Sequence, residues 1–248
     1  MHARITRVLG AAAAAGALTA LALSAAGTAG AASTATQAKP AGPVTVYVGS
    51  TGWESGSLTV TPIDAATATA GARIKVGTSA DAIAITPNGK TAYVVSSDHS
   101  VTPIDIATNT ALKPIHASGP DDIAIAPNGQ TAYVTGNRGV TPISTATNTV
   151  GTAIYVKGPT DIVITPDGQT AYVLGSRGVV KVRITASKAD KAIKVTGIWQ
   201  TLAIMPDGTT VYVVSLNPGT VTPILVATNT ALAAISVRGH PSFIAITP

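Results

Sequence analysis

Four aspartates are the residues of this chain best suited to bind a metal ion. Asp81, Asp121, Asp122 and Asp161 each lie shortly before a short apolar segment, and carboxylate oxygens are the ligands that calcium prefers. If those segments gather around one axis, the four carboxylates form an acidic rim that could hold calcium. The alternative is that they accept hydrogen bonds from backbone amides, as aspartates do in turns.

A search for catalytic motifs finds none. The chain has no cysteine, and Glu54 is its only glutamate. It also lacks a His-Glu-x-x-His zinc motif, a Walker loop, a dinucleotide fingerprint and a Gly-x-Ser-x-Gly elbow. The sequence therefore favours a non-catalytic protein, with calcium as the one cofactor it suggests.

Several large or charged residues occur at positions that vary between otherwise similar segments. Such variable loop residues are candidates for ligand binding: Trp53, His99, Arg138, Arg177, Trp199, Gln200 and His240. The tryptophans could stack on a sugar ring, anchor a partner or cap a sheet, and a lone histidine is more often a loop polar group than a ligand.

An internal repeat must position these residues. Segments of the form Pro-Asn/Asp-Gly-x-Thr-Ala/Val-Tyr-Val recur about every 40 residues, with Tyr93, Tyr133, Tyr172 and Tyr212 as their tyrosines and Tyr47-Val48 as a fifth, shorter copy. Each period divides into four short strands: an Ile-Ala-Ile type strand, the Tyr-Val strand after an Asn-Gly or Asp-Gly hairpin, a Val-Thr-Pro-Ile strand, and a last strand after Ala-Thr-Asn-Thr. Four strands per repeat without helical periodicity predict an all-β propeller of five blades.

Two features refine this fold. We expect the ring to close by pairing between residues 44–48, a second strand, and residues 243–247, a first strand. A proline lies in the third strand of four repeats, where it removes a backbone donor, so the outer strand should be short or loosely paired.

The Tyr-Val strand, the Ile-Asp and Ala-Thr-Asn-Thr of residues 104–110 and the Pro-Asp-Gly turn resemble the YVTN β-propeller repeat of surface-layer and secreted proteins, related to lactonase-like propellers. The likeness covers residues 44–248. It implies a propeller fold and an extracellular location, and it names no single chemistry.

The first residues predict export. Arg4 and Arg7 precede an unbroken Ala/Leu/Gly-rich stretch, and Ala29-Gly30-Ala31 fits a cleavage site. We expect a signal peptide over 1–31, a disordered linker over 32–42 and the propeller domain over 43–248. Without Arg4 and Arg7, 14 basic residues face 11 acidic ones, and their scatter excludes the basic stripe of a nucleic-acid binder.

The sequence thus predicts a secreted or cell-surface scaffold, a monomer that binds a protein or a wall polymer through its variable loops. Contact with a membrane is expected only through an uncleaved signal peptide. The alternative is a lactonase-like or other propeller hydrolase with a metal at the channel mouth, because loops from several blades can assemble a site that no linear motif announces.

Overall fold

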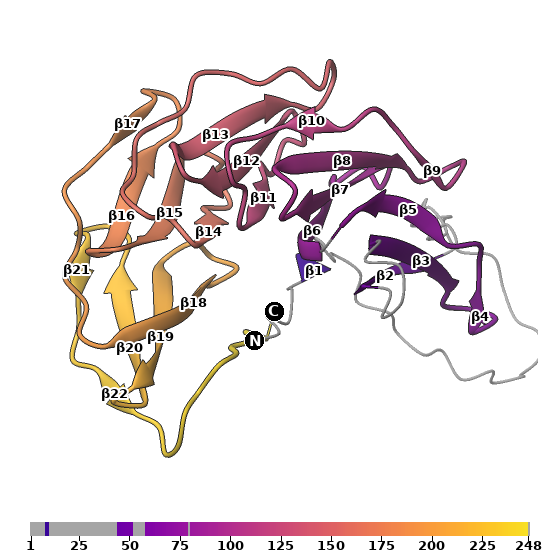
Figure 1. Ribbon diagram of the computed structural model, residues 1–248. Helices are drawn as coiled ribbons and strands as arrows, with labels where there is room; N and C mark the ends of the chain where they lie inside the picture. The colour runs from indigo at the N-terminus through magenta and orange to yellow at the C-terminus, as the bar shows by residue number, and fades with distance from the viewer. Residues whose placement is uncertain (1–7, 10–43, 52–57, 79, 248) are drawn as a thin grey trace, which may run out of the picture.

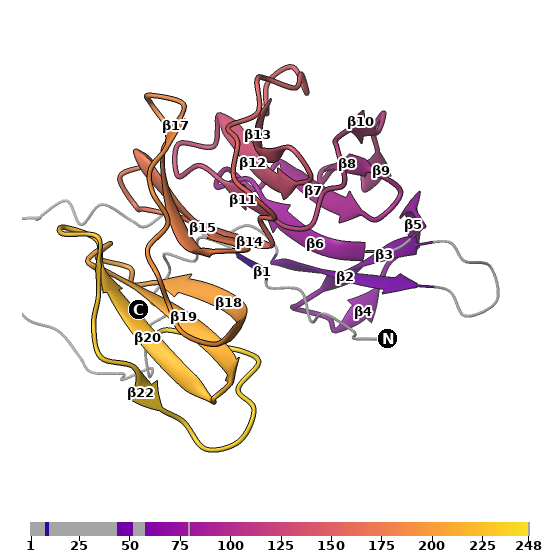
Figure 2. The ribbon, with the colours of Figure 1, turned by 60° about the vertical axis from the view of Figure 1, so that its left-hand side comes forward.

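The computed structural model describes residues 8–9, 44–51, 58–78 and 80–247. Within these ranges the chain forms β-strands, turns and irregular segments without a helix, and no membrane-spanning helix is found there. The strands build five sheets that follow one another along the chain. Figures 1 and 2 show successive sheets side by side, each turned relative to the one before it, in an arc.

The first sheet holds β2 (Thr45–Thr51), β3 (Leu58–Asp64), β4 (Thr69–Ala70) and β5 (Ile74–Gly77). The second holds β6 (Ala80–Ile85), β7 (Thr91–Ser96), β8 (Ser100–Asp105), β9 (Thr110–Ala111) and β10 (Ile115–His116). The third holds β11 (Ile123–Ile125), β12 (Thr131–Gly136) and β13 (Gly139–Ser144). The fourth holds β14 (Asp161–Ile164), β15 (Thr170–Gly175), β16 (Gly178–Arg183) and β17 (Lys188–Ala189). The fifth holds β18 (Ile198–Ile204), β19 (Thr210–Asn217), β20 (Thr220–Leu225), β21 (Thr230–Ala231) and β22 (Ile235–Ser236).

Neighbouring strands within each sheet are antiparallel and follow chain order, as in β14-β15-β16-β17. The first strand of a repeat lies toward the middle of the arc and the last toward its outside (Figure 1). This arrangement confirms the all-β, propeller-like meander expected from the repeat. In addition, β1 (Val8–Leu9) pairs in parallel with β6. This short strand lies inside the expected signal peptide.

The turn between the first and second strands differs from the expected tight hairpin. In the second sheet Thr86 and Gly89 are joined by a backbone hydrogen bond, and the Thr86 amide bonds the Thr91 carbonyl across four intervening residues. Only Gly89 has a positive φ, 67°, while the Asn88 side chain accepts a bond from the Lys90 amide. The Asn-Gly pair therefore builds a longer loop with one left-handed residue, because asparagine acts through its side chain.

The outer strand of each repeat is short, as expected, and in the second sheet it is interrupted opposite the proline of the third strand. Pro103 lies opposite Tyr93 of β7 and its carbonyl accepts the Leu112 amide at 2.8 Å, but proline has no N–H to offer in return. The outer strand pairs as two pieces, β9 and β10, on either side of the proline. The segment between them, 112–114, is irregular.

The fourth sheet has Lys181 at the position of the proline, and its outer strand is interrupted as well, between β17 and a separate bridge from Val179 to Ile193. The interruption therefore does not require the proline.

Adjacent sheets are held together by apolar cores. Four clusters of buried residues join the first sheet to the second, the second to the third, the third to the fourth and the fourth to the fifth. Each cluster packs a tyrosine and the outer-strand apolar residues of one sheet against the first and second strands of the next. Each burial is worth about 25 cal/mol per Å² of apolar surface removed from water.

A second contact, between a tyrosine and an asparagine, spans these interfaces. The hydroxyl of Tyr47 donates to Asn109 Oδ1 at 2.7 Å. Tyr93 makes the same bond to Asn148 at 2.8 Å, and Tyr172 makes it to Asn229 at 2.6 Å. In every case the tyrosine is in the second strand of one sheet and the asparagine is in the last turn of the following sheet, so we call the pair the interblade latch.

The asparagine suits this place for two reasons. Asn109, Asn148 and Asn229 have φ of 51°, 56° and 55°, and asparagine tolerates this left-handed conformation better than most residues. Its amide oxygen also reaches the hydroxyl. The fourth sheet has Ser187 at this position, with φ of 49°, and among the described residues the latch bonds are those of Tyr47, Tyr93 and Tyr172, not of Tyr133.

The expected closure of the ring is not found. β2 pairs with β3 alone, and residues 240–247 form no strand. The chain after β22 runs back toward the middle of the arc, and the first and fifth sheets lie on either side of its opening (Figure 1). The described part of the chain contains five sheets joined by four intersheet cores, and the closed five-blade ring expected from the repeats is not found in it.

The latch predicts opposite effects at two interfaces. Tyr93→Phe should lower the free energy of unfolding by about 1 kcal/mol, the net worth of a typical buried hydrogen bond. Ser187→Asn should raise it by up to about 1 kcal/mol, because it gives Tyr133 the missing acceptor in a backbone conformation that is already left-handed. Urea unfolding followed by circular dichroism measures both.

Tyr155→Phe is the matched control, since Tyr155 is 71% exposed and its hydroxyl joins no interface. Equal effects of Tyr93→Phe and Tyr155→Phe would contradict the latch.

Candidate functional site

The variable residues collect on one face, as their repeat positions indicate. The turns between second and third strands lie beside the connections between sheets: the Asn137 amide bonds the Ser118 carbonyl at 2.8 Å, and the Ser176 amide bonds the Lys157 carbonyl at 2.9 Å. We call these turns and connections the loop face. His99, Arg138 and Arg177 occupy equivalent turns of the second, third and fourth sheets, and all three are exposed.

Two other candidates differ in what can be said of them. Trp53 lies outside the described residues. His240 is exposed in the connection after β22, where its Nδ1 is 3.2 Å from the Leu216 carbonyl oxygen. This contact ties the connection to the neighbouring β19–β20 turn and leaves the rest of the ring on the surface.

Trp199 and Gln200 lie in β18, where a β-bulge interrupts the pairing with β19. The Trp199 ring packs partly buried against the core between the fourth and fifth sheets, and its indole N–H is buried without a hydrogen-bond partner in the described structure. Gln200 is exposed. A ring held in a core contributes to packing, so this position favours the capping interpretation of Trp199 over a stacking platform.

Two of the four aspartates join neighbouring sheets. Asp122 Oδ2 accepts the Ile162 amide at 3.1 Å, and Asp161 Oδ2 accepts the Leu202 amide at 2.8 Å. Each carboxyl thus binds the first strand of the following sheet, about 40 residues later. The backbone-amide alternative holds for these two residues, with the addition that the amide belongs to the next sheet.

The same two side chains also contact each other. Burial raises the pKa of Asp122 well above its usual range, and the neighbouring Asp161 carboxylate and a hydrogen bond between the two carboxyls raise it further. A carboxyl in this setting retains its proton and donates it to its neighbour, since two adjacent carboxylates cannot both ionise cheaply. Asp122 and Asp161 therefore form a proton-sharing pair near the axis.

The other two aspartates, Asp81 and Asp121, do not complete a metal site with this pair among the described residues. Asp81 is half-buried in β6, at the bulge in its pairing with β7, and the Asp121 amide bonds the Thr135 carbonyl. Among the described residues no group of three or more His, Asp or Glu side chains is placed to hold a metal ion. Calcium binding stays a prediction.

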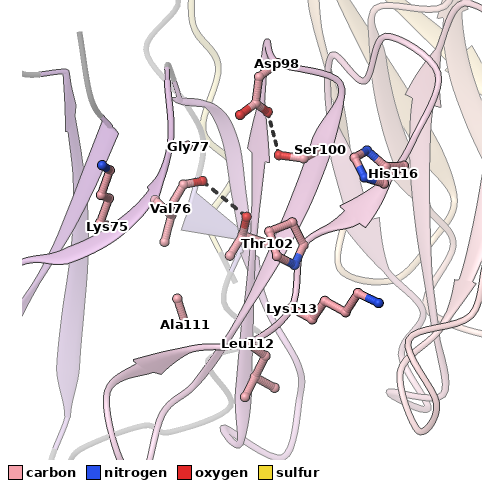
Figure 3. Close-up of a pocket in the computed structure, with 11 residues that line it drawn as sticks. Lys75, Val76, Gly77, Asp98, Ser100, Thr102, Ala111, Leu112, Lys113 and His116 are labelled. Carbon is pink, nitrogen blue, oxygen red and sulfur yellow. Dashed lines mark hydrogen bonds between the residues drawn. The ribbon is translucent and has the colours of Figure 1, made fainter. Parts of the chain in front are cut away.

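A hollow of about 430 Å³ opens between the first and second sheets. Its residues come from β5, from the β7–β8 hairpin and from the divided outer strand of the second sheet (Figure 3). The Thr102 hydroxyl donates to the Val76 carbonyl at 3.2 Å across the interface, and the Ser100 hydroxyl donates to Asp98. These bonds fix the wall between the two sheets.

The charged groups of the hollow are mostly basic. Lys75 and Lys113 flank it on opposite sides and His116 stands on its outer-strand wall, whereas Asp98 is the one carboxylate and is already bonded to Ser100 (Figure 3). Both lysines are exposed. Ammonium groups at a concave surface attract anions, and salt screens this attraction.

Sequence reasoning selected His99 beside this hollow but missed Lys75, Lys113 and His116. These residues lie on outer strands that looked architectural. Their positions carried no sequence signal beyond the residue types themselves. The position of Lys75 beside the second sheet depends on how the first two sheets pack, and the repeat pattern does not encode this packing.

Comparisons with known proteins identify the fold without a family. No family model and no curated protein sequence matches the chain. Among solved structures, the Kuenenia stuttgartiensis hydrazine synthase, a β-propeller-containing protein, matches with a TM-score of 0.64 and 23% identity over 85% of this chain and 72% of that one. At this identity the likeness concerns the fold alone: the chain is all-β and propeller-like.

The acid pair predicts that two substitutions of Asp122 differ in sign. Asp122→Asn should raise the free energy of unfolding at pH 7, because its amide bonds Asp161 and still accepts the Ile162 amide without a buried charge. Asp122→Ala leaves that amide unpaired and should cost about 1–3 kcal/mol. Urea unfolding measures both.

The gain from Asp122→Asn should depend on pH. The native pKa of Asp122 is raised, so the wild-type carboxyl favours folding below its unfolded-state pKa and loses this contribution as the pH rises through the native pKa. The advantage of the asparagine is therefore expected at pH 7 and should disappear toward pH 4. A gain that is constant with pH would contradict the shared proton.

Proposed function

We propose that this chain is an exported, non-catalytic propeller of the YVTN-repeat type that binds an anionic ligand of the cell surface in the hollow between its first two sheets and on its loop face. The observation that carries the proposal is the basic hollow between the first two sheets, with Lys75 and Lys113 on its two sides. The repeat motifs support the family, and the signal-like residues 1–31 support export.

Further cations on the loop face extend the proposed site. Arg138, Lys157 and Arg177 are exposed in the loops of the third and fourth sheets, and none of them makes an ion pair within the described residues. By contrast, Arg183 on the outer side of the fourth sheet is paired with Asp190 at 2.7 Å. A row of unpaired cations suits a polymer with repeated negative charges better than a single small anion.

An anionic polymer of the cell wall is the ligand with repeated negative charges that an exported protein would meet. Its negative groups are phosphates or carboxylates, and lysine binds either as a point charge, whereas arginine adds paired donors for both. Two soluble polymers distinguish these two kinds of negative group: polyglycerol phosphate carries phosphates and polygalacturonate carries carboxylates. The surface geometry of the loop face, with cations spread over several sheets, predicts affinity that grows with polymer length.

The test is calorimetric titration of the exported protein with each polymer. Lys75→Ala with Lys113→Ala should weaken binding about tenfold, since two partly exposed contacts of about 0.5–1 kcal/mol each are lost. Lys90→Ala is the matched control, because Lys90 is an exposed lysine of a first-to-second turn, on the opposite face. Binding of neither polymer, or equal loss in the control, would refute the proposal.

The effect of a metal ion on stability distinguishes the hydrolase alternative from the non-catalytic scaffold. A protein that holds calcium in its folded state melts at higher temperature with calcium and lower with EDTA, whereas the scaffold proposal expects the same melting temperature in both.

A further inference from the structure

The two end sheets carry apolar residues that four internal interfaces bury. At these interfaces the outer strand of one sheet packs an isoleucine against the next sheet, and Ile74 and Ile115 are each 7% exposed there. The equivalent Ile235 of the fifth sheet is 54% exposed. Val237 is 38% exposed, whereas its counterparts Val76 and Val156 are 3% exposed.

The first sheet shows the complementary exposure. Ala92 and Val94 of β7 face the preceding sheet and are fully buried. The equivalent Val46 and Val48 of β2 are each 44% exposed, although Tyr47 between them is buried toward the second sheet. The first sheet thus presents a receiving face and the fifth sheet a donating face of the same interface that recurs four times within the chain.

We propose that the donating face of one copy packs on the receiving face of a second copy, so that the protein assembles head to tail. A second copy is the expected occupant because the two end faces carry the same kinds of residues that pack against each other at the internal interfaces. The donating face carries outer-strand Ile and Val, and the receiving face carries second-strand Val. This assembly departs from the monomer expected from the sequence.

Closing the ring within one chain would change the packing between sheets more than association with a second chain would. The two faces lie on opposite sides of the opening of the arc (Figure 1), and four close-packed cores fix the rotation between successive sheets. Bringing the ends together would alter all four, and dense cores resist such changes. A second copy meets either face without disturbing them.

The symmetry of the contact makes the test specific. A head-to-tail interface joins two different surfaces, so each copy has one surface of each kind. Val46→Asp with Val48→Asp removes only the receiving face, and Ile235→Asp with Val237→Asp removes only the donating face. Val150→Asp with Tyr155→Asp is the matched control, because these exposed residues of the third sheet face neither end.

Light scattering after size exclusion gives the mass of each. The wild type and the control should exceed the mass of one chain, and each double variant alone should have the mass of one chain. An equal mixture of the two double variants should recover a mass of two chains, because each supplies the face the other lacks. A wild type of one-chain mass, as internal closure would give, overturns the proposal, and so does a double variant that remains assembled alone.

Discussion

The hydrogen bond from a tyrosine of one sheet to an asparagine of the next is the constraint around which the arc is organised. It links strand two of each latched sheet to the last turn of its neighbour, over more than 50 residues of chain. The tyrosine ring lies within the intersheet core while its hydroxyl reaches the turn. The bond therefore couples apolar packing, which has no direction, to one fixed register between sheets.

The aspartate pair also fixes the position of one sheet against the next, near the axis of the arc. Asp122 and Asp161 each accept the amide of the following first strand, so two of the four interfaces are fixed at their inner edge as well as at the latch side or the core. The third-to-fourth interface has no latch, and there the Asp122 contact and the apolar core hold the two sheets together. The binding surface proposed for Arg138, Lys157 and Arg177 requires these sheets to keep a constant angle, and the hollow beside Lys75 lies where the first two sheets meet.

The sequence allowed the repeat, the strand order and a short outer strand to be predicted, because strand alternation and turn residues act locally. It also placed His99, Arg138 and Arg177 on one face. It did not predict the ring opening, since the angle between sheets follows from core packing and not from any motif. The latch itself was visible as repeated Tyr and Ala-Thr-Asn-Thr segments, but their pairing across sheets, and its loss at Ser187, required the fold. Lys75 and Lys113 were missed for the same reason.

The burial of the latch tyrosine within the intersheet core is tested most directly by spectrophotometric titration of the tyrosines. Burial, together with the nearby Asp190, raises the pKa of Tyr172 to about 12. Because the native pKa exceeds the unfolded value, Tyr172 stabilises the fold below pH 10 and loses this contribution as the pH rises toward 12. The account predicts that the tyrosinate absorbance of Tyr172, identified by difference from Tyr172→Phe, appears near pH 12 in the folded protein. Ionisation near pH 10, like that of an exposed tyrosine, would contradict it.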